Sequence, residues 1–196
     1  MISLPSAFLP NTHYLRLIAK GEVATIYIGE QYTKQSFRNR TELLTANGRE
    51  IFTIPVQKIG YPSPQTSEIL ISEHGSWRCK MWQLLRSSYQ SSPYWAHYSD
   101  RIQQLLFYSE PRLTNYNHQW LVLLCSIWGF DTPPISFVED SFHPEYIDPT
   151  FIATEPQLPR YWQVFEKRYG YQPHLSSMDL LLNLGPEGRL YLLDLP

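Results

Sequence analysis

The sequence predicts an α/β fold with an N-terminal β-α-β unit, a mainly parallel or mixed sheet, a β-hairpin and a helical C-terminal half. Three features indicate it: apolar runs flank a helical pattern within residues 2–28, Asn47-Gly48 separates two strand-like runs, and helical spacing dominates from residue 76. The length of 196 residues fits one domain. We expect this domain to comprise a mainly sheet-forming part (1–75), a helical part (76–130), an irregular loop (131–160) and a C-terminal helix region (161–196).

The β-α-β unit begins with an apolar segment, residues 2–9, which Pro10 closes. Residues 12–20 then carry apolar side chains at helical spacing, and Asn11 or Thr12 can cap this helix by accepting its free backbone amides. A β-branched strand follows at 23–28. In such a unit, ligands gather beyond the carboxyl ends of the strands, here residues 9–14 and 29–40.

The remaining elements follow from turn residues and periodicity. Asn47-Gly48 tolerates the positive φ angles of a tight turn and predicts a hairpin over 41–56. Residues 68–71 predict a further strand, for which parallel pairing with the first two is one option, and residues 135–138 predict a short strand. Helices are expected at 76–91, at about 93–108 and at about 114–129. Near the end, Ser176 and Asp179 form the pattern of a capping box before a leucine run that stops at Gly185.

Composition narrows the class of protein. A net charge of −2 supplies no basic field, so binding to nucleic acid or to an anionic membrane is not indicated. Aromatic residues make up 15% of the chain, which fits either a core filled by rings or a large amphipathic pocket or interface. The longest apolar segment, residues 120–130, is too short to span a bilayer and predicts a buried helix.

Several chemistries lack their sequence signatures. The N-terminus has no secretory leader, and Cys79 and Cys125 match no disulfide framework or metal-ligand spacing, so we expect a reduced, cytoplasmic protein. No zinc motif, GxSxG, P-loop or GxGxxG occurs. We therefore expect neither a metal nor a cofactor, and the oligomeric state stays open.

The decapeptide QYTKQSFRNR, residues 31–40, is the most unusual stretch of the chain. It follows the second predicted strand, carries three positive charges and several amides, and contains no acid. Arginine offers a planar fork of donors and lysine a point charge, so the segment suits recognition of a phosphate or carboxylate. The alternative is a solvated basic loop that pairs with surface acids.

Two titratable residues near predicted helix starts stand out. His13 can act as a general base or donate a hydrogen bond to a developing oxyanion, or it can simply position or cap the first helix. Asp179 can pair with Arg38 across a pocket or serve only as a cap.

Five segments, in chain order, resemble motifs of the WbqC-like family: FLPNTHYLRLI, QYTKQSFRNR, FTIPV, SEHGSWRCKMWQLLRSSYQSSPYW and HLSSMDLLLN. The resemblance implies a role in O-antigen or other surface polysaccharide biosynthesis, with transfer of glycine or another aminoacyl group to a sugar. This chain departs from longer members at Ser6-Ala7-Phe8, where many resemble Gln-Pro-Tyr, and at Gly29-Glu30, where acids are frequent. Glu30 is thus the sole acid close behind the second strand.

The matching positions give the candidate site residues. Candidate catalytic residues are His13 and Glu30. Candidate ligand-binding residues are Tyr14, Gln31, Lys34, Arg38, Asn39 and Arg40, with Trp77, Arg78, Tyr89, Ser176 and Asp179 in second rank.

Two hypotheses follow. In the first, the chain is a transferase whose basic residues hold an anionic small molecule such as a nucleotide-sugar or acyl donor, while His13 or Glu30 manages the proton of the attacking amine. In the second, it is a non-catalytic sugar-nucleotide-binding or scaffolding protein that uses an aromatic surface. That surface would comprise Trp77, Trp82, Tyr94 and Trp95. A catalyst should gather its polar residues in one concave pocket, whereas a scaffold should expose an aromatic patch. Single-stranded RNA binding is disfavoured by the negative net charge.

Overall fold

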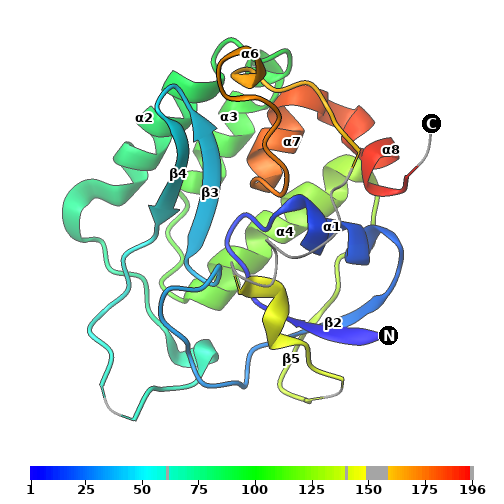
Figure 1. The fold of residues 1–196 in the computed structure, drawn as a ribbon. Coiled ribbons are helices and arrows are strands. Elements are labelled where there is room, and N and C mark those ends of the chain that lie inside the picture. Colours follow the sequence, from blue (N-terminus) through cyan, green and yellow to red (C-terminus); the bar gives the residue numbers. More distant parts are fainter. Residues whose placement is uncertain (61, 140, 149–158, 195–196) are drawn as a thin grey trace.

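The computed structural model describes residues 1–60, 62–139, 141–148 and 159–194. Its N-terminal part is the predicted β-α-β unit, formed by β1 (Ile2–Pro5), α1 (Thr12–Ala19) and β2 (Val23–Tyr27). β1 and β2 pair in parallel, and β5 (Ile135–Ser136) adds to β2 in the same direction, so the sheet order is β1-β2-β5 (Figure 1). The α/β prediction and the short strand within 135–138 are confirmed.

The start of α1 is fixed by its own sequence. The side chain of Asn11 accepts a hydrogen bond from the backbone amide of Tyr14 at 2.9 Å, which makes Asn11 the cap. The hydroxyl of Tyr14 in turn donates to the carbonyl of Pro5 at 2.8 Å. The first helix therefore begins beside the carboxyl end of β1, where the β-α-β pattern placed it.

The predicted hairpin is present as a separate two-stranded sheet, β3 (Arg40–Thr45) and β4 (Gly48–Thr53). Gly48 has a φ of 103°, which explains the glycine of the turn. The hairpin lies in front of α2 (Trp77–Tyr89) in Figure 1, and Leu43 and Leu44 of β3 are buried.

The prediction of a strand at 68–71 is wrong. Residues Thr66–Glu68 form the 3-10 helix η1, and only Leu70 and Ile71 make isolated antiparallel bridges. The amides of Ile71 and Ser72 donate to the carbonyls of Pro111 and Pro55. Proline has no backbone N–H, so neither proline can donate the next hydrogen bond of a ladder. Pairing therefore stops after single residues on either side.

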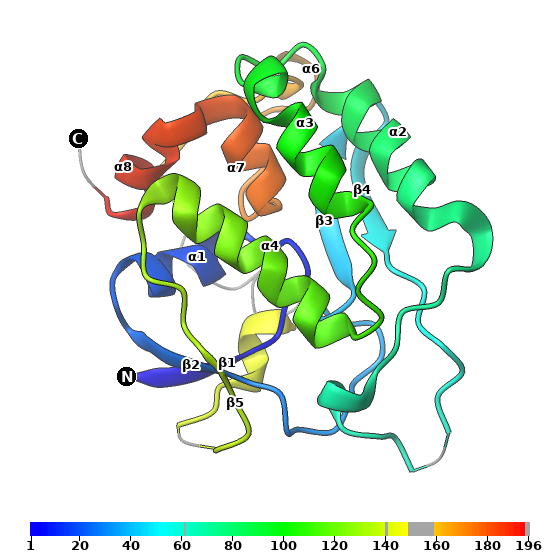
Figure 2. The same cartoon turned by 180° about the vertical axis from the view of Figure 1, so that it is seen from behind.

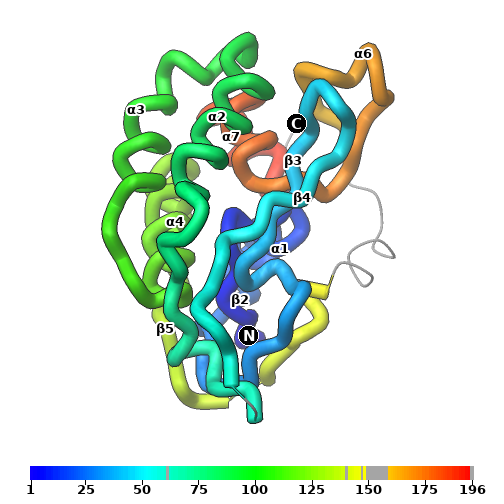
Figure 3. The backbone as a smooth tube through the Cα atoms, turned by 90° about the vertical axis from the view of Figure 1, so that its left-hand side faces the viewer, coloured from blue at the N-terminus to red at the C-terminus, as the bar shows by residue number. Residues whose placement is uncertain are grey.

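The predicted helices of the middle part are confirmed as α2, α3 (Trp95–Leu106) and α4 (Leu113–Trp128), with the short η2 (His74–Ser76) before α2. α4 crosses the back of the molecule, and α2, α3 and α4 occupy one flank (Figures 2 and 3). Among the described residues, the six largest fully buried side chains are all rings, including Trp120, Trp128 and Tyr116, so aromatic residues contribute much of the core volume. Within the described ranges, no helix has the length and apolar character needed to cross a membrane.

The C-terminal part contains η3 (Pro144–Ile147), α6 (Glu166–Tyr169), α7 (Ser177–Leu184), η4 (Gly185–Glu187) and α8 (Gly188–Leu192). The region 131–160 is thus not wholly irregular, since β5 and η3 lie in it. Positions 140 and 149–158 of that predicted loop lie outside the described residues. α7 stops at Gly185 as expected, and its cap is the side chain of Ser176, which accepts from the amide of Met178.

Gly185 allows α7 and α3 to meet. Its φ is +54°, and a Cβ atom there would lie 2.4 Å from the ring of Tyr94. We expect Gly185→Ala to lower the free energy of unfolding by roughly 2–4 kcal/mol, from backbone strain and overpacking together. The matched control is Gly60→Ala, where no atom lies within 4 Å and little change is expected. Urea unfolding of both variants tests this, and equal midpoints would contradict it.

Candidate functional site

The segment after β2 turns back toward the start of α1. The amide of Phe8 donates to the carbonyl of Phe37 at 2.9 Å, and the hydroxyl of Thr41 donates to the carbonyl of Leu9 at 3.0 Å. Residues 36–39 are buried, whereas Gln31, Lys34 and Gln35 are exposed. Residues 36–39 therefore pack inward, whereas residues 31–35 face solvent apart from the buried Tyr32.

A buried ion pair holds this loop. The Nε atom of Arg38 lies 2.9 Å from Oε1 of Glu30, and the side chains are only 3% and 10% exposed. Nη1 of Arg38 also donates to the hydroxyl of Ser36 at 3.3 Å. A charge removed from water needs a partner, so Glu30 is engaged in fixing the guanidinium. Arg38 is thereby a rigid positive group, while Lys34 is an exposed one.

Other residues of the decapeptide support the backbone. The side-chain amide of the buried Asn39 donates to the carbonyl of Ile54 at 2.8 Å. Arg40 begins β3 opposite Thr53 and is half-buried. Gln31 is exposed, and its main chain forms an isolated bridge with residue 65. None of these three candidates lines the cavity between residues 33–38 and η3.

Lys34 and Arg38 line one cavity, about 540 Å³ in volume, beyond the carboxyl end of β2. Its lining residues are Thr33, Lys34, Gln35, Ser36, Arg38, Pro144, Glu145 and Asp148. The loop 33–38 supplies one wall and the turn at η3 supplies the other. The volume lies in the range of small-molecule sites.

His13, the second residue of α1, packs against the same turn. Its ring stacks on that of Tyr146, with centroids 5.5 Å apart, and Tyr146 directly follows the cavity residue Glu145. Nδ1 of His143 contacts Oε1 of Glu145 at 2.8 Å. The helix η3 therefore contacts α1 through Tyr146 and lines the cavity through Glu145.

A second histidine, His174, approaches the first. The two rings meet edge to face at 6.4 Å, and His174 has a φ of +59° just before the cap of α7. The chain segments before α1 and α7 bond to each other, since the amide of Ser177 donates to the carbonyl of Pro10 at 2.8 Å. Sequence reasoning singled out His13 for its place at a helix start. The same signal would have found His174.

Asp179 occupies a buried polar cluster. Its carboxylate accepts hydrogen bonds from the hydroxyls of Tyr161 at 2.6 Å and Tyr89 at 3.0 Å, and from the side-chain amide of Gln163 at 3.2 Å. Burial raises the pKa of Asp179 to about 6, against the pull of these donors. The capping-box prediction is wrong for this residue, because distant side chains occupy its oxygens and the amide of Ser176 donates to the carbonyl of Glu42. Tyr89 is accordingly part of this cluster.

Trp77 and Arg78 belong to the helical part. The guanidinium of Arg78 lies 4.4 Å from the ring centre of Trp77 and forms an ion pair with Glu73 at 2.9 Å. Arg78 also donates to the carbonyl of Leu106 at the end of α3. Both candidates stabilise the junction of α2 and α3, and neither lines the cavity.

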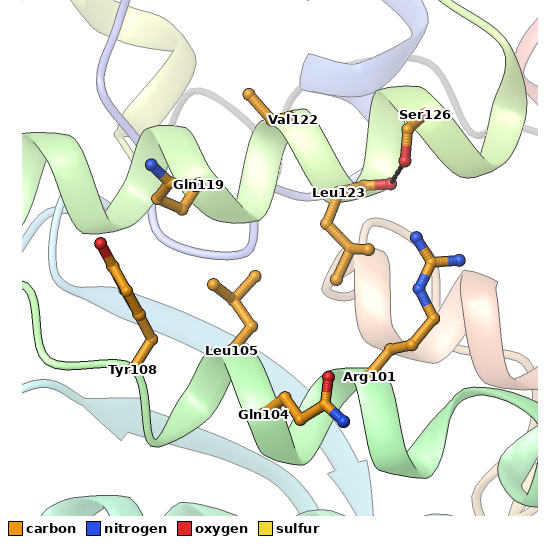
Figure 4. Close-up of a pocket in the computed structure, with 8 residues that line it drawn as sticks. All are labelled: Arg101, Gln104, Leu105, Tyr108, Gln119, Val122, Leu123 and Ser126. Carbon is orange, nitrogen blue, oxygen red and sulfur yellow. Dashed lines mark hydrogen bonds between the residues drawn. The ribbon is translucent and has the colours of Figure 1, made fainter.

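The predicted aromatic surface is largely covered. Trp77 is buried, Trp82 and Trp95 are half-buried and stack on each other at 5.3 Å, and Tyr94 is half-buried against Gly185. A different hollow, about 400 Å³, lies between α3 and α4 (Figure 4). Its one charged lining residue is Arg101, and it contains none of the predicted site residues.

The buried Cys125 is poorly suited to act as a nucleophile. Burial raises the pKa of the Cys125 thiol to about 11, which disfavours the thiolate. No group of three or more His, Cys, Asp or Glu side chains in the described ranges is arranged to hold a metal ion.

The structure thus has an α/β fold with a polar cavity beyond the carboxyl end of its parallel strands. The WbqC-like protein family matches this chain over residues 6–139, and the chain belongs to that family. It is 26% identical to the uncharacterized protein Rv1507c of Mycobacterium tuberculosis, over 95% of this chain and 94% of the relative. No solved structure matches it.

The buried carboxyl of Asp179 predicts a specific pH dependence. Its pKa is about 6 in the fold, against an ordinary value of 3.8. The folded protein therefore binds this proton more tightly than the unfolded chain. The resulting stability is fully present below about pH 4 and is lost as the pH rises through about 6.

We compare the free energy of unfolding of the natural protein with that of Asp179→Asn. Relative to the variant, the natural protein should become more stable by about 2–3 kcal/mol when the pH falls from 7.5 to 4. Urea unfolding across this range measures it. Asp131→Asn, at an exposed position, is the control. A difference independent of pH would contradict the shift.

Proposed function

We propose that this chain is a small-group transferase that attaches an aminoacyl group, such as glycine, to a sugar in O-antigen or other surface polysaccharide biosynthesis. The cavity between residues 33–38 and η3 holds its anionic donor or nucleotide-sugar. The observation that carries the proposal is the meeting of Lys34 and Arg38 in one cavity, with His13 against the neighbouring ring of Tyr146. The transferase class itself is what the resemblance to WbqC-like motifs implies.

The charges suit a phosphate-bearing ligand. Arg38 is held by Glu30 and Ser36, so its position changes little when a ligand arrives. Lys34 is exposed and can close on the anion as a point charge. A positive group that is already fixed stabilises developing negative charge without reorganisation, which is the main source of rate in acyl transfer.

His13 is the proton acceptor in this proposal. The sugar amine attacks the acyl carbonyl, a C–N bond forms, and the bond to the leaving group breaks. The amine proton passes to the imidazole, the side chain that ordinarily exchanges protons near neutral pH. Stacking on Tyr146 sets the plane of the ring. Glu30 is a positioning residue, since it holds Arg38.

The engagement of Glu30 by Arg38 favours a second candidate function, non-catalytic binding of a sugar nucleotide. Only His13 of the two candidate catalytic residues then remains for proton transfer. Both functions use the same cavity, and a measurement of product formation distinguishes the transferase from the binding protein.

Binding is tested with a thermal-shift screen of nucleotide-sugars, followed by calorimetry on the probe with the largest shift. We expect Lys34→Ala to raise the dissociation constant of that probe about tenfold, because the substitution removes a charge-assisted hydrogen bond. Lys167→Ala is the matched control, since it removes an exposed lysine on α6, away from the cavity lining. Equal affinities for the natural protein and Lys34→Ala would refute the site.

Catalysis is tested with His13→Gln. With glycyl-adenylate and an aminosugar nucleotide as substrates, we expect the transfer rate to fall about 10²–10⁴-fold while the dissociation constant of the nucleotide stays unchanged. Mass spectrometry of the glycylated product measures the rate. A natural protein that binds the nucleotide but forms no product would support the non-catalytic alternative.

A further inference from the structure

We propose that one water molecule binds in a buried site between the end of β1 and α4, where it bridges Asn117, His118 and Ser6. These three residues line a small cavity together with Ala7, Tyr14, Ile26 and Leu121. This cavity shares no lining residue with the one between residues 33–38 and η3. The water site is therefore separate from the proposed anion site and does not depend on the transferase function.

The side-chain amide of Asn117 presents an oxygen that needs a donor. Asn117 is 2% exposed, and its amide nitrogen donates to the hydroxyl of Ser6 at 3.0 Å and to the carbonyl of Arg38 at 2.8 Å. Because a carbonyl can only accept, the contact with Arg38 fixes which end of the amide carries the nitrogen. The other end, Oδ1, is buried and has no hydrogen-bond partner among the described residues. Buried amide oxygens in folded proteins are nearly always hydrogen-bonded.

The next residue along α4, His118, supplies a second acceptor. Its Nδ1 atom is also buried and has no hydrogen-bond partner in the described part of the chain. Burial lowers the pKa of His118, so the imidazole is neutral at pH 7 and one of its ring nitrogens carries a lone pair. Two consecutive residues of α4 thus line one cavity, and each has a buried polar atom to satisfy there.

The remaining polar side chains of the lining leave water as the donor. The hydroxyl of Tyr14 already donates its proton to the carbonyl of Pro5 at 2.8 Å. Ser6 accepts from Asn117 and keeps its own hydroxyl proton to donate. A water molecule fits this set, because it can donate to Oδ1 of Asn117 and to Nδ1 of His118 while it accepts from Ser6. Three hydrogen bonds are also what buried waters typically make.

The size and the charge of the cavity select water among small ligands. The volume open to the centre of a water-sized sphere is about 10 Å³, which is room for one water molecule. The lining contains no carboxylate, whereas calcium and magnesium ions are bound by several oxygens that usually include carboxylates. The cavity therefore suits a neutral ligand that both donates and accepts.

The water joins a polar cluster that holds α4 against the end of β1. In Figure 2, α4 crosses in front of the segment that leaves β1, and Asn117 connects Ser6 of that segment with the backbone of Arg38. The water adds His118 to this cluster and satisfies the last acceptor of the Asn117 amide. A buried amide that is fully hydrogen-bonded keeps one orientation, so the water helps to fix the backbone of Arg38.

A crystal structure of the full chain, at a resolution that shows ordered water, locates the ligand. We expect one density peak at about 3 Å from both Oδ1 of Asn117 and Nδ1 of His118. A cavity without density would overturn the proposal. So would an amide of Asn117 whose oxygen meets a protein donor, because the water would then have no acceptor to satisfy.

Oxygen-17 magnetic relaxation dispersion tests the site in solution, because it detects waters with long residence times. His118→Phe keeps a ring at this position and removes the acceptor nitrogen. We expect one long-lived water to exchange about tenfold faster in this variant, since it loses one of three hydrogen bonds. His97→Phe, at an exposed position of α3, is the matched control and should leave the exchange rate unchanged. Equal exchange in the natural protein and in a folded His118→Phe would refute the bridge to His118.

Discussion

The buried ion pair between Arg38 and Glu30 is the constraint on which the rest of the site depends. A guanidinium that is 3% exposed requires a charged partner, so the chain between these residues must close as a compact loop. The carbonyl of Arg38 then accepts from the side chain of Asn117 at 2.8 Å, and Asn117 also donates to Ser6 at 3.0 Å. One polar cluster thus joins the loop, α4 and the end of β1, and leaves Lys34 directed outward as the accessible charge.

A second buried polar cluster surrounds Asp179 at the start of α7. Asp179 draws Tyr161 and Gln163 onto α7, and Tyr89 links this carboxylate to the backbone amide of Leu44 in β3 at 3.3 Å. Between the two clusters run the segments that start α1 and α7. Their backbones bond to each other, so the positions of both helix starts, and of the histidines near them, are set by main-chain geometry rather than by surface contacts.

The sequence predicted correctly those elements that depend on interactions between residues close together in the chain. The hairpin at Asn47-Gly48 and the helices of residues 76–130 follow from turn chemistry and from the spacing of apolar side chains, and the rule that ligands gather at strand ends pointed to Lys34 and Arg38. Other features depend on distant partners. Ile71 meets prolines instead of a strand, and Asp179 meets phenols from another segment. Neither partner is visible within a few residues of sequence, and the same holds for the acids that face Lys34.

The two walls of the cavity also differ in what supports them. The basic wall lies within residues 6–139, the part that matches the WbqC-like family, and a buried ion pair holds its arginine. The other wall lies beyond that match, on the short 3-10 helix η3, whose Tyr146 packs on His13. A short turn can change its side chains without disturbing a buried cluster. The wall that carries Lys34 and Arg38 is therefore tied to the buried part of the fold, whereas the side chains of the η3 wall can vary separately.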